Sequence, residues 1–139
     1  LNVASSAGIA ALPLMGPYNV TKAGVIALSE TLYAELAKDD VQVTALCPTF
    51  FRTNIAKAAH TFGGNTGERT NKLVEEAKWS AEEIAIHALD GMLDGRLYVI
   101  PQPDGKLVWR MKRLFGQRFY DGIGMAARRG VLDRVAGRK

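Results

Sequence analysis

A tyrosine and a lysine stand four residues apart at the start of a predicted helix, in the sequence Tyr18-Asn-Val-Thr-Lys22. This spacing places both side chains on one face of the helix, within reach of each other. A free phenol titrates near about 10 and is a poor proton acceptor at neutral pH. A nearby ammonium and the positive end of the helix dipole both stabilise a phenolate, which favours general acid–base catalysis. The pair therefore predicts proton transfer.

Two serines, Ser5 and Ser6, precede this pair and follow a short apolar stretch, residues 1–4. The stretch is predicted to be the end of a buried strand that runs into a loop. Active sites of open α/β sheets form where strands end beside the starts of helices. The serines are therefore predicted to lie at the same end of the sheet as Tyr18 and Lys22.

The elements that position these residues alternate between helix and strand. Apolar residues at helical spacing after Pro17 predict a helix from about Tyr18 to Lys38. A strand over residues 41–46 follows and ends at Pro48. Ser80 and Glu83 form a capping box for a helix that ends before Gly95, and residues 96–100 predict a third strand. The alternation predicts an α/β fold, half of a doubly wound parallel sheet with right-handed crossovers.

The segment from Asn2 to Lys22 resembles the short-chain dehydrogenase/reductase family. That family has a strand ending in an Asn-x-Ser-Ser-x-x-Gly-like sequence, with Tyr-x-x-x-Lys thirteen residues after the serine, and this spacing selects Ser5 over Ser6. The resemblance implies the C-terminal, catalytic half of a Rossmann-type domain that uses NAD or NADP. It also implies that Ser5 hydrogen-bonds the substrate oxygen and that Tyr18 exchanges a proton with it. Lys22 would favour the ionised phenol and hold the nicotinamide ribose, and Tyr18 would also contact the cofactor.

A second segment, Cys47 to Thr53, is similar to the Pro-Gly-x-Val-x-Thr segment of the same family. It matches at Pro48 and Thr53, but Thr49 replaces the glycine and Phe51 replaces a small aliphatic residue. By resemblance, Pro48, Phe51 and Thr53 border the nicotinamide and its carboxamide. The departures at Thr49 and Phe51 would alter how the backbone approaches the ring.

The glycine-rich turn with which this family binds the pyrophosphate has no counterpart in the sequence. The glycines of Gly63-Gly64-Asn65-Thr66-Gly67 follow no predicted strand and are interpreted as part of a lid over about residues 54–79. The chain is therefore expected to be a fragment that is catalytically incompetent alone. Apolar residues in and before the lid indicate a lipophilic ketone or secondary alcohol as substrate; they are Phe50, Phe51, Ile55, Ala56, Ala58, Ala59 and Phe62.

Composition limits the other classes of function. The 139 residues suffice for one modest domain, predicted as residues 1–103 with a basic, helical extension over 104–139. Cys47 is the only cysteine, and His60 and His87 have no partners at metal-ligand spacing, so no metal site is predicted. No apolar run approaches the roughly 20 residues that span a bilayer, and no signal peptide is evident, so a cytoplasmic protein is expected.

The extension carries the positive charge, with ten basic and three acidic residues, and leaves residues 1–103 at −3 out of a total of +4. A basic amphipathic stretch over residues 106–118 is typical of a helix at a membrane surface or of one packed over a subunit. A non-catalytic binding or membrane-surface protein on the same scaffold is the alternative function. No nucleic-acid partner is predicted, because no recognition motif accompanies the charge. The resemblance implies a homodimer or homotetramer.

Overall fold

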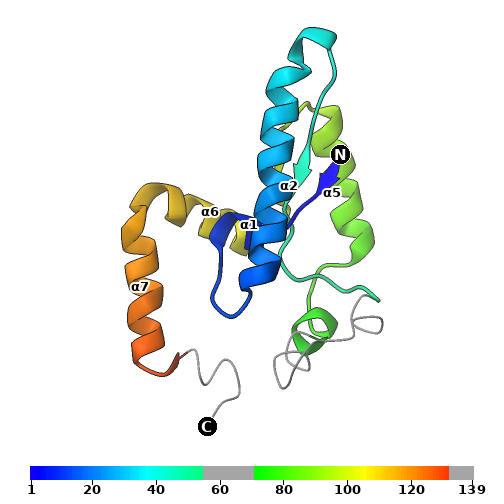
Figure 1. Cartoon of the computed structure of the whole chain (residues 1–139). Coiled ribbons are helices and arrows are strands. Elements are labelled where there is room, and N and C mark those ends of the chain that lie inside the picture. The colour runs from blue at the N-terminus through cyan, green and yellow to red at the C-terminus, as the bar shows by residue number, and fades with distance from the viewer. Residues whose placement is uncertain (55–70, 132–139) are drawn as a thin grey trace. The chain divides into compact units, whose positions relative to one another are not determined.

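The computed structural model describes residues 1–54 and 71–131 (Figure 1). The chain divides into two compact units. The first combines residues 1–49 with residues 82–110, and the second combines residues 50–81 with residues 111–139. The predicted catalytic residues Ser5, Tyr18 and Lys22 all belong to the first unit.

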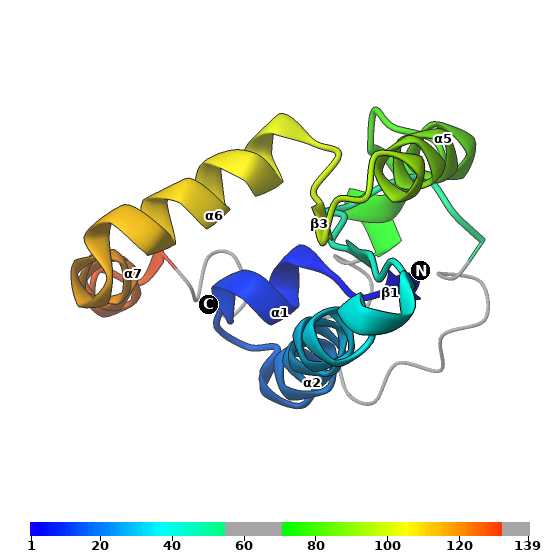
Figure 2. The same ribbon diagram turned by 90° about the horizontal axis from the view of Figure 1, so that it is seen from above.

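The first unit is built on three parallel strands, β1 (Asn2–Val3), β2 (Ala45–Leu46) and β3 (Tyr98–Val99), in the order β1-β2-β3. Backbone hydrogen bonds between neighbouring segments continue past the ends of these short strands. The backbone N–H of Cys47, the residue after β2, donates to Val99 O at 2.8 Å, for example. Helix α2 covers one face of the sheet and α5 covers the other (Figure 2). The predicted α/β fold with a parallel sheet is confirmed.

The strands are shorter than the sequence predicts. Residues 41–46, which favour strand structure, predict one strand, but only Ala45 and Leu46 form β2. Residues 1–4 are predicted to be buried, yet Leu1 and Val3 are exposed and only Ala4 is deeply buried. β1 is an edge strand of the described sheet, so it has a neighbouring strand, β2, on one side only.

Helix α2 (Gly16–Glu35) begins with proline in its first turn, as expected for a residue that lacks a backbone donor. Its inner side buries Ile26 and Ser29. The Ser29 hydroxyl accepts a hydrogen bond from Asn2 Nδ2 at 3.1 Å, which ties the helix to β1. The sequence predicts a helix as far as Lys38; instead a 3-10 turn (Ala37–Asp39) closes the segment before Asp40, whose φ is 56°.

Helix α1 (Ser6–Ala10) occupies a segment that the sequence predicts as a loop, and that prediction is wrong. Ser5 is the N-cap of α1, and its hydroxyl oxygen accepts a hydrogen bond from Ala7 N at 3.2 Å. The helix packs on α2 through Gly8. A Cβ placed on Gly8 would lie 2.6 Å from the backbone carbon of Lys22, so only glycine allows this approach.

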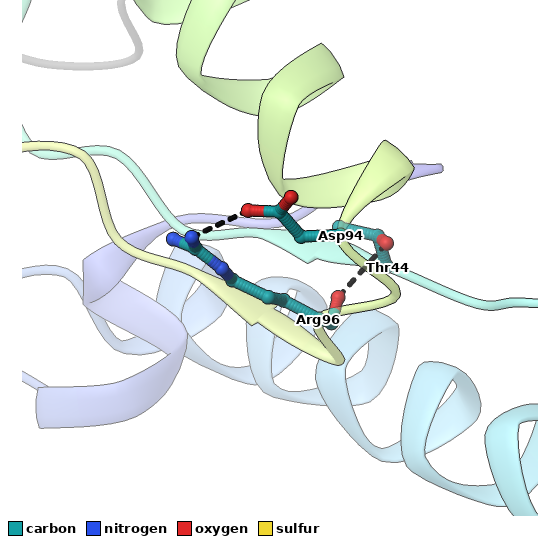
Figure 3. Close-up of polar contacts among 3 residues, drawn as sticks. All are labelled: Thr44, Asp94 and Arg96. Atoms are coloured by element: carbon teal, nitrogen blue, oxygen red, sulfur yellow. Dashed lines mark hydrogen bonds and ion pairs between the residues drawn. The ribbon is translucent and has the colours of Figure 1, made fainter.

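Helix α5 (Ala81–Leu93) packs on β3 through Gly91, because a Cβ on Gly91 would overlap the Val99 side chain. The helix ends with Gly95 at φ 68°, where Gly95 N and Arg96 N donate back to carbonyls of the last turn. This confirms the predicted end. In Figure 3 Thr44 donates to Arg96 O at 2.9 Å, and the Arg96 side chain pairs with Asp94.

The core of the first unit lies between the sheet and its helices and consists of Ala4, Ile26, Ala45, Cys47 and Ile100. Trp109 of α6 (Pro103–Phe115) packs against it. Gly116, at φ 52°, separates α6 from α7 (Gln117–Arg128), and both helices lie within or next to the segment predicted as a helical extension. None of the described helices is long and apolar enough to cross a membrane.

Candidate active site

Ser5 is held at the end of β1 by backbone hydrogen bonds of its two neighbours to β2 and to the segment that follows β2. Ala4 N donates to Leu46 O at 2.8 Å and Ser6 N donates to Pro48 O at 2.9 Å, so the backbone on both sides of Ser5 is fixed. The Ser5 oxygen accepts from Ala7 N. A hydroxyl that accepts one hydrogen bond still has its own proton to donate. Ser5 can therefore cap α1 and donate to a substrate oxygen at the same time.

Tyr18 and Lys22 lie together on α2, with the Lys22 ammonium 5.7 Å from the centre of the Tyr18 ring. Tyr18 is 43% exposed, so its phenol is accessible. Lys22 Nζ donates to Val3 O at 3.2 Å, which anchors the side chain to the end of β1, two residues before Ser5. The predicted proximity of tyrosine and lysine is therefore present in the structure.

Two residues that the sequence did not single out hold these groups together. Gly8 lets α1, which Ser5 caps, approach the α2 backbone at Lys22. Asn19 is buried beside Tyr18 and donates from Nδ2 to Leu12 O at 2.7 Å, which fixes the connection between α1 and α2. A polar residue next to the tyrosine on a predicted amphipathic helix is the signal that could have indicated Asn19.

Cys47 lies directly beneath the Ser5 segment and is fully buried. Burial raises the pKa of the Cys47 thiol to about 12, and a backbone hydrogen bond from Ser5 opposes this effect. The thiol therefore stays protonated at neutral pH and acts as a small apolar side chain under the site.

The segment after β2 is fixed to the start of α6 through Thr49. Its backbone N–H donates to Gln102 Oε1 at 3.0 Å and its hydroxyl donates to Asp104 Oδ1 at 3.2 Å. The Thr49 methyl group lies beside Gly105, where an added Cβ would approach it to 3.0 Å. Thr49, which replaces the glycine of the resembling segment, therefore forms hydrogen bonds to Gln102 and Asp104. Sequence reasoning missed Gln102, a buried polar residue between two prolines.

The three predicted nicotinamide-facing residues are divided between the units. Pro48 is buried in the first unit beside the Ser5 segment, whereas Phe51 and Thr53 are partly buried in the second. There Arg52 N donates to Trp79 O at 2.8 Å, and Thr53 lines a recess of about 540 Å³ with residues from Arg52 to Ala81. Residues 55–70, which include His60 and most of the predicted lid, lie outside the described residues.

A recess of about 550 Å³ opens elsewhere in the first unit, between α5, β3 and the start of α6. His87, Tyr98 and Trp109 are among its lining residues, and the predicted catalytic residues are not. His87 Nδ1 lies 3.0 Å from Glu83 O. Within residues 1–54 and 71–131, no cluster of three or more metal-binding side chains is present.

Part of a nicotinamide cofactor site fits the described residues. An ammonium has three donors, and one of those on Lys22 goes to Val3 O, which leaves donors for sugar hydroxyls. The strand-to-helix turns of the described chain include no glycine-rich turn that could bind a pyrophosphate through its amides. Among residues 1–54 and 71–131, the groups that fit a nicotinamide cofactor are therefore those suited to its nicotinamide riboside end.

Comparison with known proteins relates this chain to short-chain dehydrogenases. A family model described as short chain dehydrogenase matches residues 1–62. An NAD-dependent glycerol dehydrogenase of Listeria innocua is 32% identical over 90 residues, which are 64% of this chain and 35% of that protein. The chain thus spans about a third of the length of that relative.

Two solved structures share the fold. A short-chain dehydrogenase/reductase of Burkholderia phymatum, in complex with NAD, has a TM-score of 0.71 and 27% identity, covering 80% of this chain and 45% of that one. A short-chain dehydrogenase of Sphingobium yanoikuyae, in complex with NADPH, has a TM-score of 0.62 and 27% identity, covering 88% of this chain and 43% of that one.

Proposed function

Because the chain belongs to the short-chain dehydrogenase/reductase family, we propose that it forms the catalytic part of an NAD- or NADP-dependent oxidoreductase that interconverts a ketone and a secondary alcohol. The observation that carries this proposal is the pairing of Tyr18 with Lys22 beside the strand end that holds Ser5. When bound, the cofactor would supply or accept the hydride. The chain's own residues handle the proton.

Each of the three residues has a distinct task in this proposal. In the reduction, the Tyr18 phenol gives its proton to the substrate oxygen, and in the oxidation it takes the proton back. The Ser5 hydroxyl donates a hydrogen bond to the same oxygen and orients it. The Lys22 ammonium stabilises the phenolate that remains and donates to the nicotinamide ribose. These positive and donor groups act where negative charge develops in the transition state.

Pro48, Phe51 and Thr53 are proposed to border the nicotinamide ring and its carboxamide. Their place directly after β2 supports this role, because ligands of open α/β sheets bind outside the carboxyl ends of the strands. The bonds that fix Thr49 to Gln102 and Asp104 would hold the start of this segment in one position.

The proposed substrate is lipophilic. Phe50 is 40% exposed and Phe51 is partly buried, so both present aromatic surface near the proposed nicotinamide-facing segment. A panel of medium-chain ketones, cyclic ketones, glycerol and other polyols, assayed with the complete gene product, tests this proposal. A preference for glycerol or other polyols would contradict it.

We also propose that residues 1–139 alone do not complete the reaction, because the described part of the chain offers suitable groups for only one end of the cofactor. Fluorescence titration of the 139-residue chain with NADH and NADPH, followed by a ketone-reduction assay, is the direct test. Micromolar binding together with turnover would refute this part of the proposal.

The outward face of α2 supports a dimer or tetramer. Its exposed residues are small or apolar over four turns: Val20, Ala23, Gly24, Ala27, Leu28, Thr31 and Ala34. Val20 is 73% exposed and Leu28 is 54% exposed. Small residues let two helices approach closely. The charge on this face, from exposed Glu35, lies at the very end of α2, and a face with so little charge suits burial against a second copy.

A further inference from the structure

Helix α6 carries a row of apolar side chains that it does not bury. Leu107, Met111 and Leu114 recur at intervals of four and three residues, so they lie along one side of the helix. Leu107 is 60% exposed, Met111 39% and Leu114 77%. Phe115, also exposed, widens this row at its C-terminal end. Three large hydrophobic side chains aligned in this way form a continuous strip.

The opposite side of α6 fixes the helix to the sheet. Gly105 is buried, and a Cβ added to it would lie 2.9 Å from Ile100 Cγ2. The centroids of the Trp109 and Tyr98 rings are 6.2 Å apart, and Trp109 packs against the core. On a helix of about 3.6 residues per turn, Leu107 projects nearly opposite the direction shared by Gly105 and Trp109. Leu107 therefore points away from the sheet, and Met111 and Leu114 continue the row along the same side of the helix.

A row of cations runs beside the apolar row. Lys106, Arg110 and Arg113 have the same spacing as the apolar row. Each precedes one residue of that row by one position, which places it about 100° away around the helix. All three are exposed. With Lys112, α6 has four basic residues against a single acidic one, Asp104, which accepts a hydrogen bond from Thr49. The exposed surface of α6 is therefore apolar along one strip and positive along the next.

We propose that α6 docks on the surface of an anionic lipid bilayer, with Leu107, Met111 and Leu114 at the boundary of the acyl chains. Lys106, Arg110 and Arg113 then reach the phosphates of the headgroups. An amphipathic helix with Lys and Arg on its polar face and Leu and Phe on its apolar face binds at this depth. Long basic side chains extend their charged ends to the headgroups while their carbon stems stay in contact with apolar surface.

The positive charge of α6 favours a lipid surface over a second copy of the chain as the partner of this helix. A symmetric pair built on α6 would need acidic side chains to meet the basic row, because like charges that face each other oppose association. The only carboxylate of α6 is engaged by Thr49. An anionic bilayer supplies the missing charge. This docking does not depend on the proposed reaction, since neither row contains Ser5, Tyr18 or Lys22.

Co-sedimentation of the 139-residue chain with vesicles tests the proposal. We expect binding to vesicles of phosphatidylcholine mixed with phosphatidylserine, little binding to phosphatidylcholine alone, and release by added salt. The double change Arg110→Gln with Arg113→Gln should weaken binding about thirtyfold. The double change Leu107→Gln with Leu114→Gln should weaken it at least about tenfold. All four side chains are exposed, so circular dichroism should show unchanged folding.

The matched controls are Leu93→Gln and Lys38→Gln, which alter an exposed leucine at the end of α5 and an exposed lysine after α2. Neither should change vesicle binding. The proposal is overturned if the chain does not bind the mixed vesicles, if neutral vesicles bind it equally well, or if the controls weaken binding as much as the α6 variants. It is also overturned if the leucine pair instead dissociates an oligomer without affecting vesicle binding.

Discussion

Tyr18 is the residue on which the proposed proton transfer depends. In Tyr18→Phe the ring and its packing remain, but the group that exchanges the proton is absent. We expect turnover of ketone and alcohol by the complete gene product to fall by about a hundredfold to ten-thousandfold. Cofactor binding, measured by NADH or NADPH fluorescence, should change little, because the Tyr18 ring stays in place and Lys22 keeps its proposed contact with the nicotinamide ribose.

Tyr33→Phe is the matched control, since Tyr33 lies on the same helix and is 41% exposed, close to the 43% of Tyr18. It should retain full activity. If Tyr18→Phe also retained activity, the chain would fit the alternative of a non-catalytic binding or membrane-surface protein on the same scaffold.

The buried thiol of Cys47 leads to a prediction about how the free energy of unfolding depends on pH. Burial raises the pKa of its thiol from 9.0 to about 12, so the folded chain holds this proton more tightly than the unfolded chain does. The resulting stability is complete below about pH 9 and is lost as the pH rises toward 12. Denaturant unfolding between pH 8 and pH 11 should show this loss, of at most about 1.4 kcal/mol per pH unit.

Cys47→Ala removes the titrating group and serves as the comparison. Its stability should be lower at neutral pH, because the substitution leaves a small cavity, but it should fall less steeply above pH 9. Equal slopes for the two proteins would show that Cys47 does not cause the alkaline loss. The native thiol should also react slowly with a disulfide reagent and become reactive on unfolding.

At the scale of single residues, the sequence predicted that Tyr18 and Lys22 lie close together, but it did not predict the residues that support the site. Spacing alone placed Tyr18 near Lys22, because the helix is regular. The partners of Thr49 could not be predicted, since Gln102 and Asp104 are more than fifty residues away and meet it only through the sheet. The catalytic roles of Ser5, Tyr18 and Lys22 and the roles of the nicotinamide-facing residues remain predictions.

At the scale of elements, the packing of α1 on α2 depends on Gly8. Gly8→Ala would place a carbon 2.6 Å from the Lys22 backbone, and a backbone cannot rotate away as a side chain can. We expect a loss of about 1–3 kcal/mol in the free energy of unfolding, measured by denaturant titration. Because Ser5 caps α1 and Lys22 lies on α2, activity of the complete protein should fall as well.

Gly122→Ala is the control for this prediction. Gly122 lies inside α7, and a Cβ there would meet nothing within 4 Å. Since alanine favours a helix over glycine, this variant should gain about 0.5–1 kcal/mol. If Gly8→Ala were as well tolerated as Gly122→Ala, the close approach of α1 and α2 would not matter for stability.

The long helices were predicted because their periodicity extends over several turns, whereas the short elements were not. Helix α1 has only five residues, too few for a periodic signal, and it exists because Ser5 caps it and α2 covers it. The strands are short for a related reason: hydrophobic residues such as Val43 are buried without continuing the ladder of β2. Burial and strand pairing are separate properties, and hydrophobicity reports only the first.

At the scale of the whole molecule, charge and apolar surface are separated along the chain. The outward face of α2 is small, apolar and almost free of charge, while α6 pairs its apolar row with cations. Charge patterning could be read from the sequence, but which apolar residues stay exposed could not, because that depends on which side of each helix the sheet occupies. The two faces therefore predict different partners, a second copy for α2 and a lipid surface for α6.

The α2 face gives the final prediction. Leu28→Glu places a carboxylate in the middle of the proposed contact, where pairing with a second copy would bury two like charges. Light scattering should show the unaltered protein as a dimer or tetramer and the variant as a smaller species. The structure of the single chain should be unaffected, because Leu28 is 54% exposed. Lys38→Glu, an exposed change of charge just after α2, should leave the mass unchanged. A monomer in all three proteins would refute the proposed pairing, whereas a shift confined to Leu28→Glu would assign the contact to α2.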